Sequence, residues 1–503
     1  MILKIDGLLK PYYAQTLAMI FFPGAKFPEN EEKTPETVEA SIRLTEDEAG
    51  VSATVTLTEG EKTSSGFHTA AWNDSRFDRD RQRQIAAGEA FMEAGTAFTG
   101  LTPPWGILTG VRPAKVAMEL LEAGMTPAEA AAEIENAYHV TPVKARLAAD
   151  VAAAEKRLIT PESRRLCSVY IGIPFCPTRC AYCSFVSYTS PGLLKLIPDY
   201  LTALLSDIDG IFSVIREHGM KVASVYIGGG TPTILTAEQM TRLLDKVNEN
   251  VTELEEFTVE AGRPDTITKE KLDVFRAHGV SRMSVNPQSL NEEVLRKIGR
   301  SHTTEQFYRA YELARESGIR DINVDLIAGL PYDTTESFCR TVDGVVALDP
   351  ENITVHTFSV KRSSEFKAEG RFDPASEIAA ESVRYSQTAL GEAGYLPYYM
   401  YRQKNTVGNL ENVGYAKKGH EGLYNIYMME EVHSIFAAGA GSVTKLVSEP
   451  AADGSVRIER VFQPKYPYEY LSGEEKAAEK LKALRTAARD FFAPHYEEPN
   501  ERN

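Results

Sequence analysis

Apolar and polar positions divide residues 166–394 into short apolar runs that alternate with amphipathic segments. The apolar runs have the length and the β-branched content of buried strands: CSVYIGIP, ASVYIGGG, FTVEAGRP, SRMSVNPQ, DINVDLIAGL and ITVHTFSV. Segments between them, such as AEQMTRLLDKVNEN and TEQFYRAYELARESG, repeat apolar residues at helical spacing. Successive β–α units predict an α/β fold with a parallel sheet. A single winding direction favours a partial (β/α)6 barrel, with a doubly wound sheet as the alternative.

The chain on either side of this region has different patterns. Residues 1–80 alternate apolar and polar positions, as in VEASIRL and VSATVTLTE, which predicts a β-rich N-terminal module. Residues 81–165 are rich in Ala at helical spacing, so the N-terminal region as a whole is expected to be a small α+β unit. Residues 395–503 are interpreted as a C-terminal extension, associated with the substrate and ending in a helical tail. The stretch PPWGILTGVRP at 103–113 is interpreted as a loop between helices.

Composition narrows the class of protein. The chain has 503 residues, 43% hydrophobic and 25% charged, which is ordinary for a soluble globular protein of several domains. Its net charge is −16 and it has no dense Lys/Arg block, so a nucleic-acid partner is disfavoured. No apolar run approaches the ~20 residues of a membrane span, and the first residues lack a signal-peptide pattern. Five cysteines, three of them crowded, do not resemble a disulfide framework, so we expect a reducing, cytoplasmic compartment.

Three cysteines, Cys176, Cys180 and Cys183, form a C-x3-C-x2-C pattern directly after the first predicted strand. A structural zinc site normally has four ligands, often in paired C-x2-C knuckles, and the other two cysteines lack that spacing. Three thiolates would hold a [4Fe–4S] cluster and leave one iron open to a substrate or cofactor. The pattern therefore favours a cluster over zinc. Cys167 and Cys339 are expected to be buried apolar residues.

Other unusual residues lie at the C-terminal ends of the predicted strands. Glycines follow the second run, Glu260 lies in the third, and Gln288 ends the fourth. Barrels of β–α units form their sites at this end of the strands. Glycines there allow a ligand to approach the backbone closely. The sequence thus predicts a site at this end of the barrel.

The cysteine loop IPFCPTRCAYC resembles that of the radical S-adenosylmethionine (SAM) enzymes, which read C-x3-C-x-aromatic-C. Four more motifs resemble the oxygen-independent coproporphyrinogen III oxidase family: GGGTPT at 228–233, GVSRMSVNPQS at 279–289, IGRSH at 298–302 and NVDLIAGLP at 323–331. The resemblance covers about residues 165–445, with order and spacing kept. The length and the N-terminal region are most similar to the longer coproporphyrinogen dehydrogenase branch.

This resemblance implies cofactors and residue roles. The three loop cysteines would bind a [4Fe–4S] cluster, and the methionine moiety of SAM would occupy the open iron. One or two SAM molecules are expected, with Ser359 matching a contact to the second. The remaining positions that match SAM contacts of the family are Tyr170, Tyr182, Gly228, Gly229, Gly230, Thr231, Glu260, Gln288, Arg300 and Asp325.

The resemblance also implies an activity. The similar enzymes convert two propionate side chains of coproporphyrinogen III to vinyl groups, without oxygen, in haem biosynthesis. A flavodoxin- or ferredoxin-type electron donor and an unidentified electron acceptor would be the partners. Two alternatives stay open: a haem chaperone and a haem-degrading methyltransferase of the same superfamily. The chaperones carry H-N-x-x-Y-W in a segment that here reads YNIYMM at 424–429, without the His.

A substrate with four propionates needs several cations around an apolar, macrocycle-sized space. The region after the sixth strand interleaves cations with tyrosines. We expect the run YYMYRQKN at 398–405 to form a ligand-facing wall, with Arg402 contacting the substrate. The full set of candidates is Lys361, Arg362, Arg402, Lys404, Lys417, Lys418, Tyr398, Tyr399, Tyr401 and Tyr415.

Overall fold

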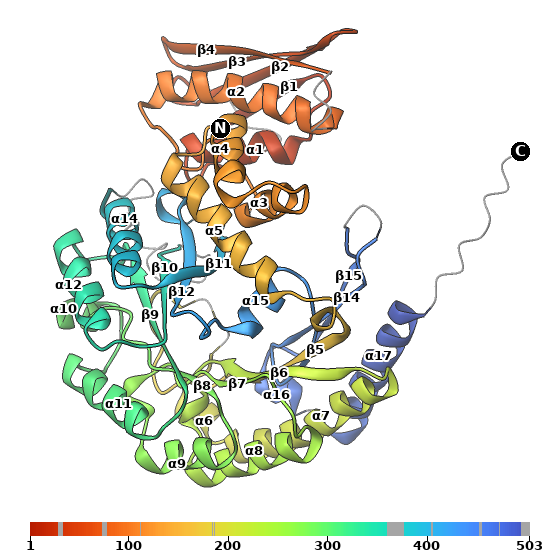
Figure 1. Ribbon diagram of the computed structural model, residues 1–503, viewed down its shortest axis with the longest axis vertical. Helices are drawn as coiled ribbons and strands as arrows, with labels where there is room; N and C mark the ends of the chain where they lie inside the picture. The colour runs from red at the N-terminus through yellow and green to blue at the C-terminus, as the bar shows by residue number, and fades with distance from the viewer. Residues whose placement is uncertain are drawn as a thin grey trace, which may run out of the picture.

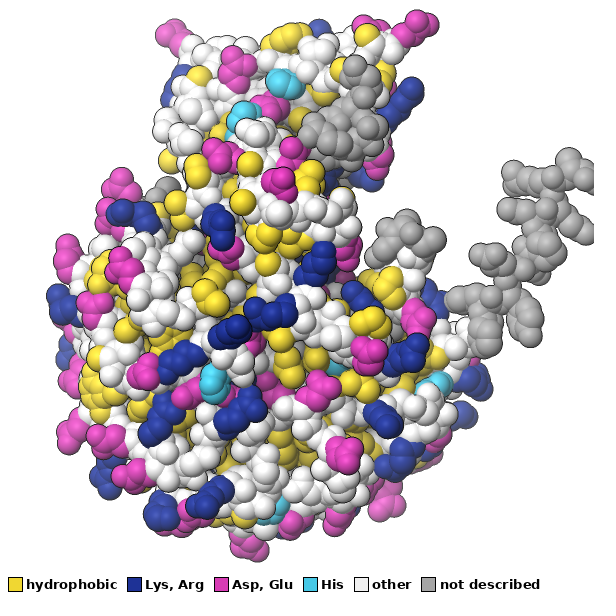
Figure 2. Space-filling view, viewed as in Figure 1, with side chains coloured by type: hydrophobic (Ala, Val, Ile, Leu, Met, Phe, Trp, Pro, Cys, Tyr) yellow, Lys and Arg dark blue, Asp and Glu magenta, His cyan; other side chains and the backbone are white. Residues whose placement is uncertain are grey.

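A computed structural model places the 503 residues in a large α/β body with a smaller unit at one end (Figure 1). The structure describes the whole chain except residues 29–33, 73–77, 111, 184, 186, 360–376, 404–405, 452–454, 472 and 494–503. No helix among the described residues is long and apolar enough to cross a membrane. Figure 2 shows acidic and basic side chains interspersed over one face of the molecule.

Parallel strands in chain order form the centre of the large body. They are β5 (Leu166–Ile173), β6 (Lys221–Gly229), β7 (Glu256–Val259), β8 (Arg282–Ser284), β9 (Asp321–Ala328) and β10 (Asn352–Thr357). Each pairs in parallel with the next, so the winding never reverses. The predicted partial barrel is therefore confirmed, and the doubly wound alternative is wrong, because such a sheet reverses its strand order at a switch point. The strands are buried on both faces, which explains their continuous apolar runs.

Helices connect these strands and cover the outside of the sheet (Figure 1). The longer ones are α7 (Ile197–Glu217), α8 (Ala237–Asn250), α9 (Lys269–Ala277), α11 (Thr304–Glu316), α12 (Thr335–Val346) and α14 (Glu377–Glu392). Two shorter helices, α6 (Pro191–Leu194) and α10 (Glu292–Lys297), precede α7 and α11 in the connections after β5 and β8. Thr236 and Thr303 begin α8 and α11 with capping boxes, each worth about 1 kcal/mol. Cys339, expected to be buried, lies on the partly exposed side of α12, whereas Cys167 is fully buried in β5.

C-terminal residues extend the barrel sheet at both edges. The strands β11 (Leu396–Arg402) and β12 (Glu411–Ala416) add antiparallel pairing beside β10. At the other edge β13 (Ser434–Ala438) pairs in parallel with β5, followed by β14 (Val443–Val447) and β15 (Ile458–Phe462). The short helix α15 (Leu423–Met429) connects β12 to β13, the short helix α16 (Pro467–Tyr470) follows β15, and α17 (Glu474–Phe492) packs on α7. The barrel sheet is thus extended by segments far along the chain.

The smaller unit is a four-stranded sheet with two helices on one face. Its strands are β1 (Ile2–Asp6), β2 (Glu39–Glu46), β3 (Gly50–Glu59) and β4 (Lys62–Ala71), in that spatial order. In β3 every second residue is fully buried, which matches the alternation in the sequence. The helices α1 (Pro11–Phe21) and α2 (Arg79–Thr99) cover it. A helical connector then leads to the barrel: α3 (Pro113–Glu122), α4 (Pro127–Tyr138) and α5 (Pro142–Leu158).

Candidate functional site

A large cavity opens at the C-terminal ends of the parallel strands. Its volume is about 500 Å³, and it extends from the cysteine loop after β5 to β11 and α15. Of the predicted cofactor contacts, all but Gly228 line it: Tyr170, Cys176, Cys180, Tyr182, Cys183, Gly229, Gly230, Thr231, Glu260, Gln288, Arg300, Asp325 and Ser359. Residues from six β–α units therefore meet in one place, as the position of sites in such barrels predicts.

The cysteine loop is held by backbone hydrogen bonds to neighbouring segments. The Cys176 N–H donates to the Tyr188 carbonyl at 3.1 Å, and the Ala181 N–H donates to the Ile298 carbonyl at 3.0 Å. The Thr231 hydroxyl lies 3.3 Å from the Cys176 sulfur, to which it can donate. Burial raises the pKa of Cys176, and it raises the pKa of Cys183 to about 11. The thiols of Cys176 and Cys183 are therefore protonated until a metal supplies positive charge. This behaviour is expected of metal ligands and not of a reactive nucleophile, which needs a lowered pKa.

Glycines at the end of β6 make room for the loop and for Glu260. A Cβ on Gly230 would lie 2.5 Å from the Phe175 carbonyl oxygen and 3.0 Å from the Cys176 sulfur. A Cβ on Gly228 would lie 2.8 Å from Glu260 Oε2. Gly228 is not among the residues lining the cavity, so its effect is on the position of Glu260. The distances of 2.5 and 2.8 Å are shorter than real Cβ contacts and the 3.0 Å distance is tight, so any larger residue would displace its neighbour.

Two carboxyl groups in the cavity have pKa values that move in opposite directions. Burial, with a smaller contribution from the Asp325 charge, raises the pKa of Glu260 to about 8. Burial also disfavours ionised Asp325, but the nearby His356 side chain and the hydrogen bond from Asn323 outweigh it and lower the pKa. Near pH 7 Glu260 is therefore mostly protonated and Asp325 ionised. One carboxyl can donate a hydrogen bond while its neighbour can only accept.

Polar side chains fix the geometry around Asp325. The Asn323 and Asn286 side-chain amides each donate to one of its oxygens at 2.7 Å, and His356 Nε2 lies 3.9 Å from Oδ2. On the adjoining wall Arg300 donates to the Tyr182 hydroxyl at 2.8 Å and to the Gly262 carbonyl at 3.1 Å. Arg300 is 6% exposed, so its charge acts in a region of low dielectric.

Gln288 provides an observation that points to a ligand. It has a left-handed φ of 68° and lines the cavity, while its buried Oε1 has no hydrogen-bond partner in the structure. Buried amide oxygens are normally satisfied, and leaving one unpaired costs about 1–3 kcal/mol. A polar ligand in the cavity would remove that cost. The donor set, the glycine clearance and this orphaned acceptor together fit an amino-acid-like cofactor beside a thiolate-bound cluster.

A wall of stacked tyrosines borders the other side of the cavity. Tyr170 and Tyr226 have ring centroids 6.1 Å apart, and Tyr226 and Tyr424 are 4.7 Å apart. Sequence reasoning missed Tyr226 and Asn323, which precede a predicted residue by two positions on the same strand, and Asn286, which precedes Gln288 by two positions just after β8. Since side chains on a strand repeat their direction every second residue, this spacing was a usable signal. The residues found in this way are Tyr226, Asn286 and Asn323.

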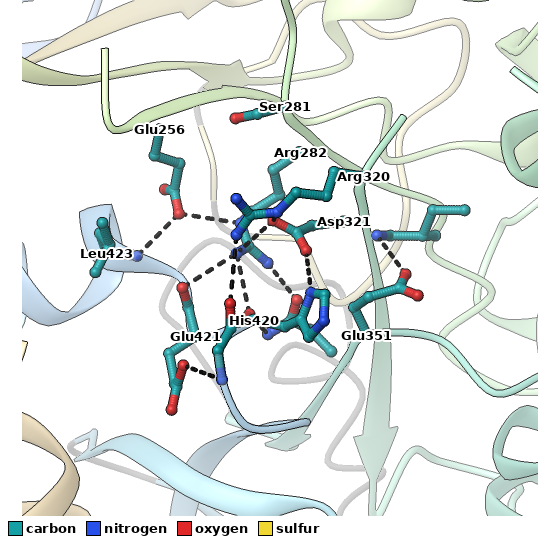
Figure 3. Close-up of polar contacts among 12 residues, drawn as sticks. Glu256, Ser281, Arg282, Arg320, Asp321, Glu351, His420, Glu421 and Leu423 are labelled. Carbon is teal, nitrogen blue, oxygen red and sulfur yellow. Dashed lines mark hydrogen bonds and ion pairs between the residues drawn. The ribbon is translucent and has the colours of Figure 1, made fainter. Parts of the chain in front are cut away.

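Tyr424 is held in that wall by a buried ionic network at the opposite end of the strands (Figure 3). The Glu256 carboxylate accepts the N–H groups of Leu423 and Tyr424 at 2.9 and 3.2 Å, at the start of α15. Arg282 donates to Glu256 at 3.0 Å and to the His420 and Glu421 carbonyls at 3.0 and 3.1 Å. The network therefore fixes the segment whose next turn carries Met428 and Met429 on the cavity wall.

The expected substrate wall is only partly present. Tyr399 and Tyr401 line the cavity, because they are alternate residues of β11. Arg402 follows on the opposite face, so the expectation that it lines this cavity is wrong; it borders a smaller one. Lys417 forms an ion pair of 2.8 Å with Asp349 instead. Tyr398, Tyr415 and Lys418 do not line the cavity, and Lys361, Arg362 and Lys404 lie outside the described residues.

Residues 170–344 match the family model of the radical SAM superfamily. This range contains the cysteine loop, the glycines and the paired carboxyls described above. The cofactors of this superfamily are a [4Fe–4S] cluster and SAM, and the donor set of the cavity fits both.

Individual proteins give a closer comparison. The chain is 36% identical over 498 residues to the oxygen-independent coproporphyrinogen-III oxidase-like protein HemZ of Bacillus subtilis, covering 95% of this chain and 96% of that protein. It is 32% identical to the haem chaperone HemW of B. subtilis, covering 54% of this chain and 70% of HemW. The solved structure of coproporphyrinogen III oxidase (HemN) from Escherichia coli matches with a TM-score of 0.48 and 21% identity, over 67% of this chain and 78% of that one. The chain therefore belongs to the radical SAM superfamily and, within it, to the family of oxygen-independent coproporphyrinogen III oxidase-like proteins.

Proposed function

We propose that this protein catalyses the oxygen-independent oxidative decarboxylation of coproporphyrinogen III to protoporphyrinogen IX. The observation that carries the proposal is the match to a coproporphyrinogen-III oxidase-like protein over nearly the whole of both chains. The match includes the N-terminal unit and the C-terminal strands, which lie outside the part matched by the superfamily model. The tyrosine-lined end of the cavity adds support, since a macrocycle needs a broad apolar surface.

The cavity residues would divide between cluster and SAM. Cys176, Cys180 and Cys183 would bind the cluster and leave one iron open to SAM. Among the SAM contacts, Glu260 and Gln288 would hold polar groups, while Tyr182 and Arg300 would form an adjoining wall. Ser359, beyond β10, would contact a second SAM. When bound, the cluster and SAM supply a radical that can remove a hydrogen atom.

The protein's own residues would place a propionate and keep water away. At each propionate a hydrogen atom leaves the β-carbon, the carboxylate leaves as carbon dioxide, and one electron passes to an external acceptor as the vinyl double bond forms. Tyr226 and Tyr424 form a stacked apolar wall that limits water beside that carbon. His356 and Asn412 line the cavity and can donate hydrogen bonds to a substrate carboxylate.

The proposed partners follow from this reaction. A flavodoxin- or ferredoxin-type protein would supply the reducing electron, and a separate acceptor would take the electron released by the substrate. We place the protein in the cytoplasm, because a reducing compartment keeps free cysteines and an exposed cluster intact.

Haem binding is the second candidate function. Haem chaperones from several bacteria match 50–62% of this chain. Met428 and Met429 line the cavity, and methionine sulfur is a known axial ligand of haem iron. A chaperone would bind haem in this cavity and leave coproporphyrinogen III unchanged.

A strictly anaerobic assay separates the two functions. The cluster-loaded protein is incubated with coproporphyrinogen III, SAM, reduced flavodoxin and an electron acceptor, and the products are separated by chromatography. The proposal predicts vinyl-bearing product and carbon dioxide, both absent with Cys180→Ala. Tight haem binding with no loss of coproporphyrinogen III would support the chaperone instead.

A further inference from the structure

Residues 105–110, in the stretch PPWGILTGVRP, contact a buried arginine. Arg402 is 6% exposed, and its guanidinium stacks on the ring of Trp105, with Cζ 5.5 Å from the ring centroid. One Nη1 donates to the Leu108 carbonyl at 2.6 Å and to the Gly110 carbonyl at 3.4 Å. The loop therefore contributes a π face and two carbonyls to Arg402, and no carboxylate.

Charge around Arg402 does not balance. The only described acid whose charge acts on Arg402 is Glu411, which is 1% exposed. Glu411 already accepts the Trp105 indole N–H at 2.8 Å and forms an ion pair with buried Lys144. Two buried cations thus share one carboxylate. Burial lowers the pKa of Arg402 to about 10. An additional anion beside the guanidinium would raise this pKa again.

A small cavity lies beside this unbalanced charge. It has a volume of about 80 Å³ between α1, the 103–113 loop and the residues after β11. Its lining includes Thr16, Thr109, Arg402, Thr406 and Asn409, and none of the described residues that line it is acidic. A space of this size holds a few waters or one small anion.

Two residues that line this cavity carry donors without an acceptor. Among the described residues, neither the buried Nε of Arg402 nor the buried Nδ2 of Asn409 has a hydrogen-bond partner. Native proteins rarely leave buried donors unsatisfied, and a charged donor is the costlier case. An oxyanion with two oxygens could accept from both residues and balance the charge.

The cavity also adjoins the main site. Gln403 lines both cavities, and Arg402 follows Tyr401, which lines the main one. We propose that Arg402 and Asn409 form a carboxylate-binding subsite next to the main cavity. The carboxylate has two possible sources, a propionate of the tetrapyrrole or a free small carboxylate. Only the first source rests on the proposed function.

Binding of propionate ion tests the subsite without any turnover. Line broadening of carboxyl-13C propionate is measured by NMR with the full-length, cluster-loaded protein, in solutions of matched ionic strength. We expect saturable broadening. Its Kd should rise about tenfold or more in Arg402→Met, the loss typical of a charge-assisted hydrogen bond. Asn409→Gly should weaken binding about fivefold, the loss of a neutral hydrogen bond, and it keeps the left-handed φ of 53° accessible.

Lys418→Met is the matched control, because it removes an exposed positive charge elsewhere and should leave the Kd unchanged. Since Arg402→Met removes contacts to the 103–113 loop, Asn409→Gly keeps the test valid if that variant fails to fold. Absent or non-saturable broadening would overturn the proposal, as would equal Kd values in wild type and Asn409→Gly. Displacement of propionate by equimolar chloride would also overturn it, since it indicates a halide site.

The source of the carboxylate is decided by coproporphyrin III, the oxidised substrate analogue. If a substrate propionate occupies the subsite, Asn409→Gly weakens coproporphyrin III binding by a factor similar to that for propionate. If a free carboxylate occupies it, coproporphyrin III affinity is unchanged while propionate affinity falls. If the proposed function is wrong, only the coproporphyrin III result changes, and propionate still binds. If the subsite proposal is wrong, propionate binding itself fails, so the two cases can be told apart.

Discussion

Replacing Glu260 with Gln should remove a pH dependence from the stability of the folded protein. The side chain lines the cavity and is half-buried there, and burial together with the Asp325 charge raises its pKa from 4.5 to about 8. Glutamine has the same shape and can still accept the hydrogen bonds from the Gly229 N–H and the Tyr226 hydroxyl. The substitution therefore removes the ionisation with little change in packing.

The magnitude follows from the two pKa values. Between pH 4.5 and pH 8, Glu260 keeps its proton in the folded protein but has lost it in the unfolded chain. The free energy of unfolding of the wild type therefore falls as the pH rises. Each pH unit inside this window costs about 1.4 kcal/mol. Relative to Glu260→Gln, the wild-type protein should lose roughly 4 kcal/mol between pH 5 and pH 9, most of it below pH 8.

Thermal unfolding of the cofactor-free protein at several pH values measures this difference. The Tm of wild type should fall relative to Glu260→Gln as the pH rises from 5 to 8, and the two curves should run parallel above pH 9. Asp325→Asn removes the neighbouring negative charge and should lower the folded pKa of Glu260, which moves the upper end of the window to lower pH. Curves for wild type and Glu260→Gln that are parallel throughout would refute the reasoning, because they would show that Glu260 does not titrate in this range.

Three further substitutions test the site and its support. Cys180→Ala should abolish the visible absorption and the roughly four irons of the reconstituted protein; Cys339→Ala should keep both, and equal iron in the two variants would contradict the assignment. Gly230→Ala should lower cluster content, measured as iron per chain, because its Cβ would meet the Cys176 sulfur; normal content would show that the loop adapts. Glu256→Gln should destabilise α15 by about 1–3 kcal/mol, seen as faster hydrogen exchange at the Tyr424 amide; unchanged exchange would mean that Glu256 does not hold it.

The barrel and most of the candidate site could be predicted because their signals are local. Each β–α unit has its own periodicity, and the chain order of the units is also their spatial order. Residues at the ends of consecutive strands then converge, which brought Cys176, Glu260 and Asp325 into one cavity. The period-two pattern would also have indicated Asn286 and Tyr226.

The remaining contacts depend on residues far apart in the sequence. Nothing local in β13 indicates that it pairs with β5, more than 260 residues earlier, because a short apolar run is compatible with many partners. Arg402 was expected in the main cavity, since YYMYRQKN carries a dense mixture of tyrosines and cations. Strand alternation directs Tyr399 and Tyr401 to one face and Arg402 to the other, where Trp105 packs. That contact is set by docking of the N-terminal connector.

The most direct test of the central claim uses coproporphyrinogen III deuterated at the β-carbons of its propionates. The cluster-loaded protein is given this substrate with SAM, a reductant and an electron acceptor under anaerobic conditions, and the 5′-deoxyadenosine formed is analysed by mass spectrometry. The account predicts one deuterium in each 5′-deoxyadenosine, with one carbon dioxide released per nucleoside. Unlabelled 5′-deoxyadenosine with the porphyrinogen unconsumed would contradict it.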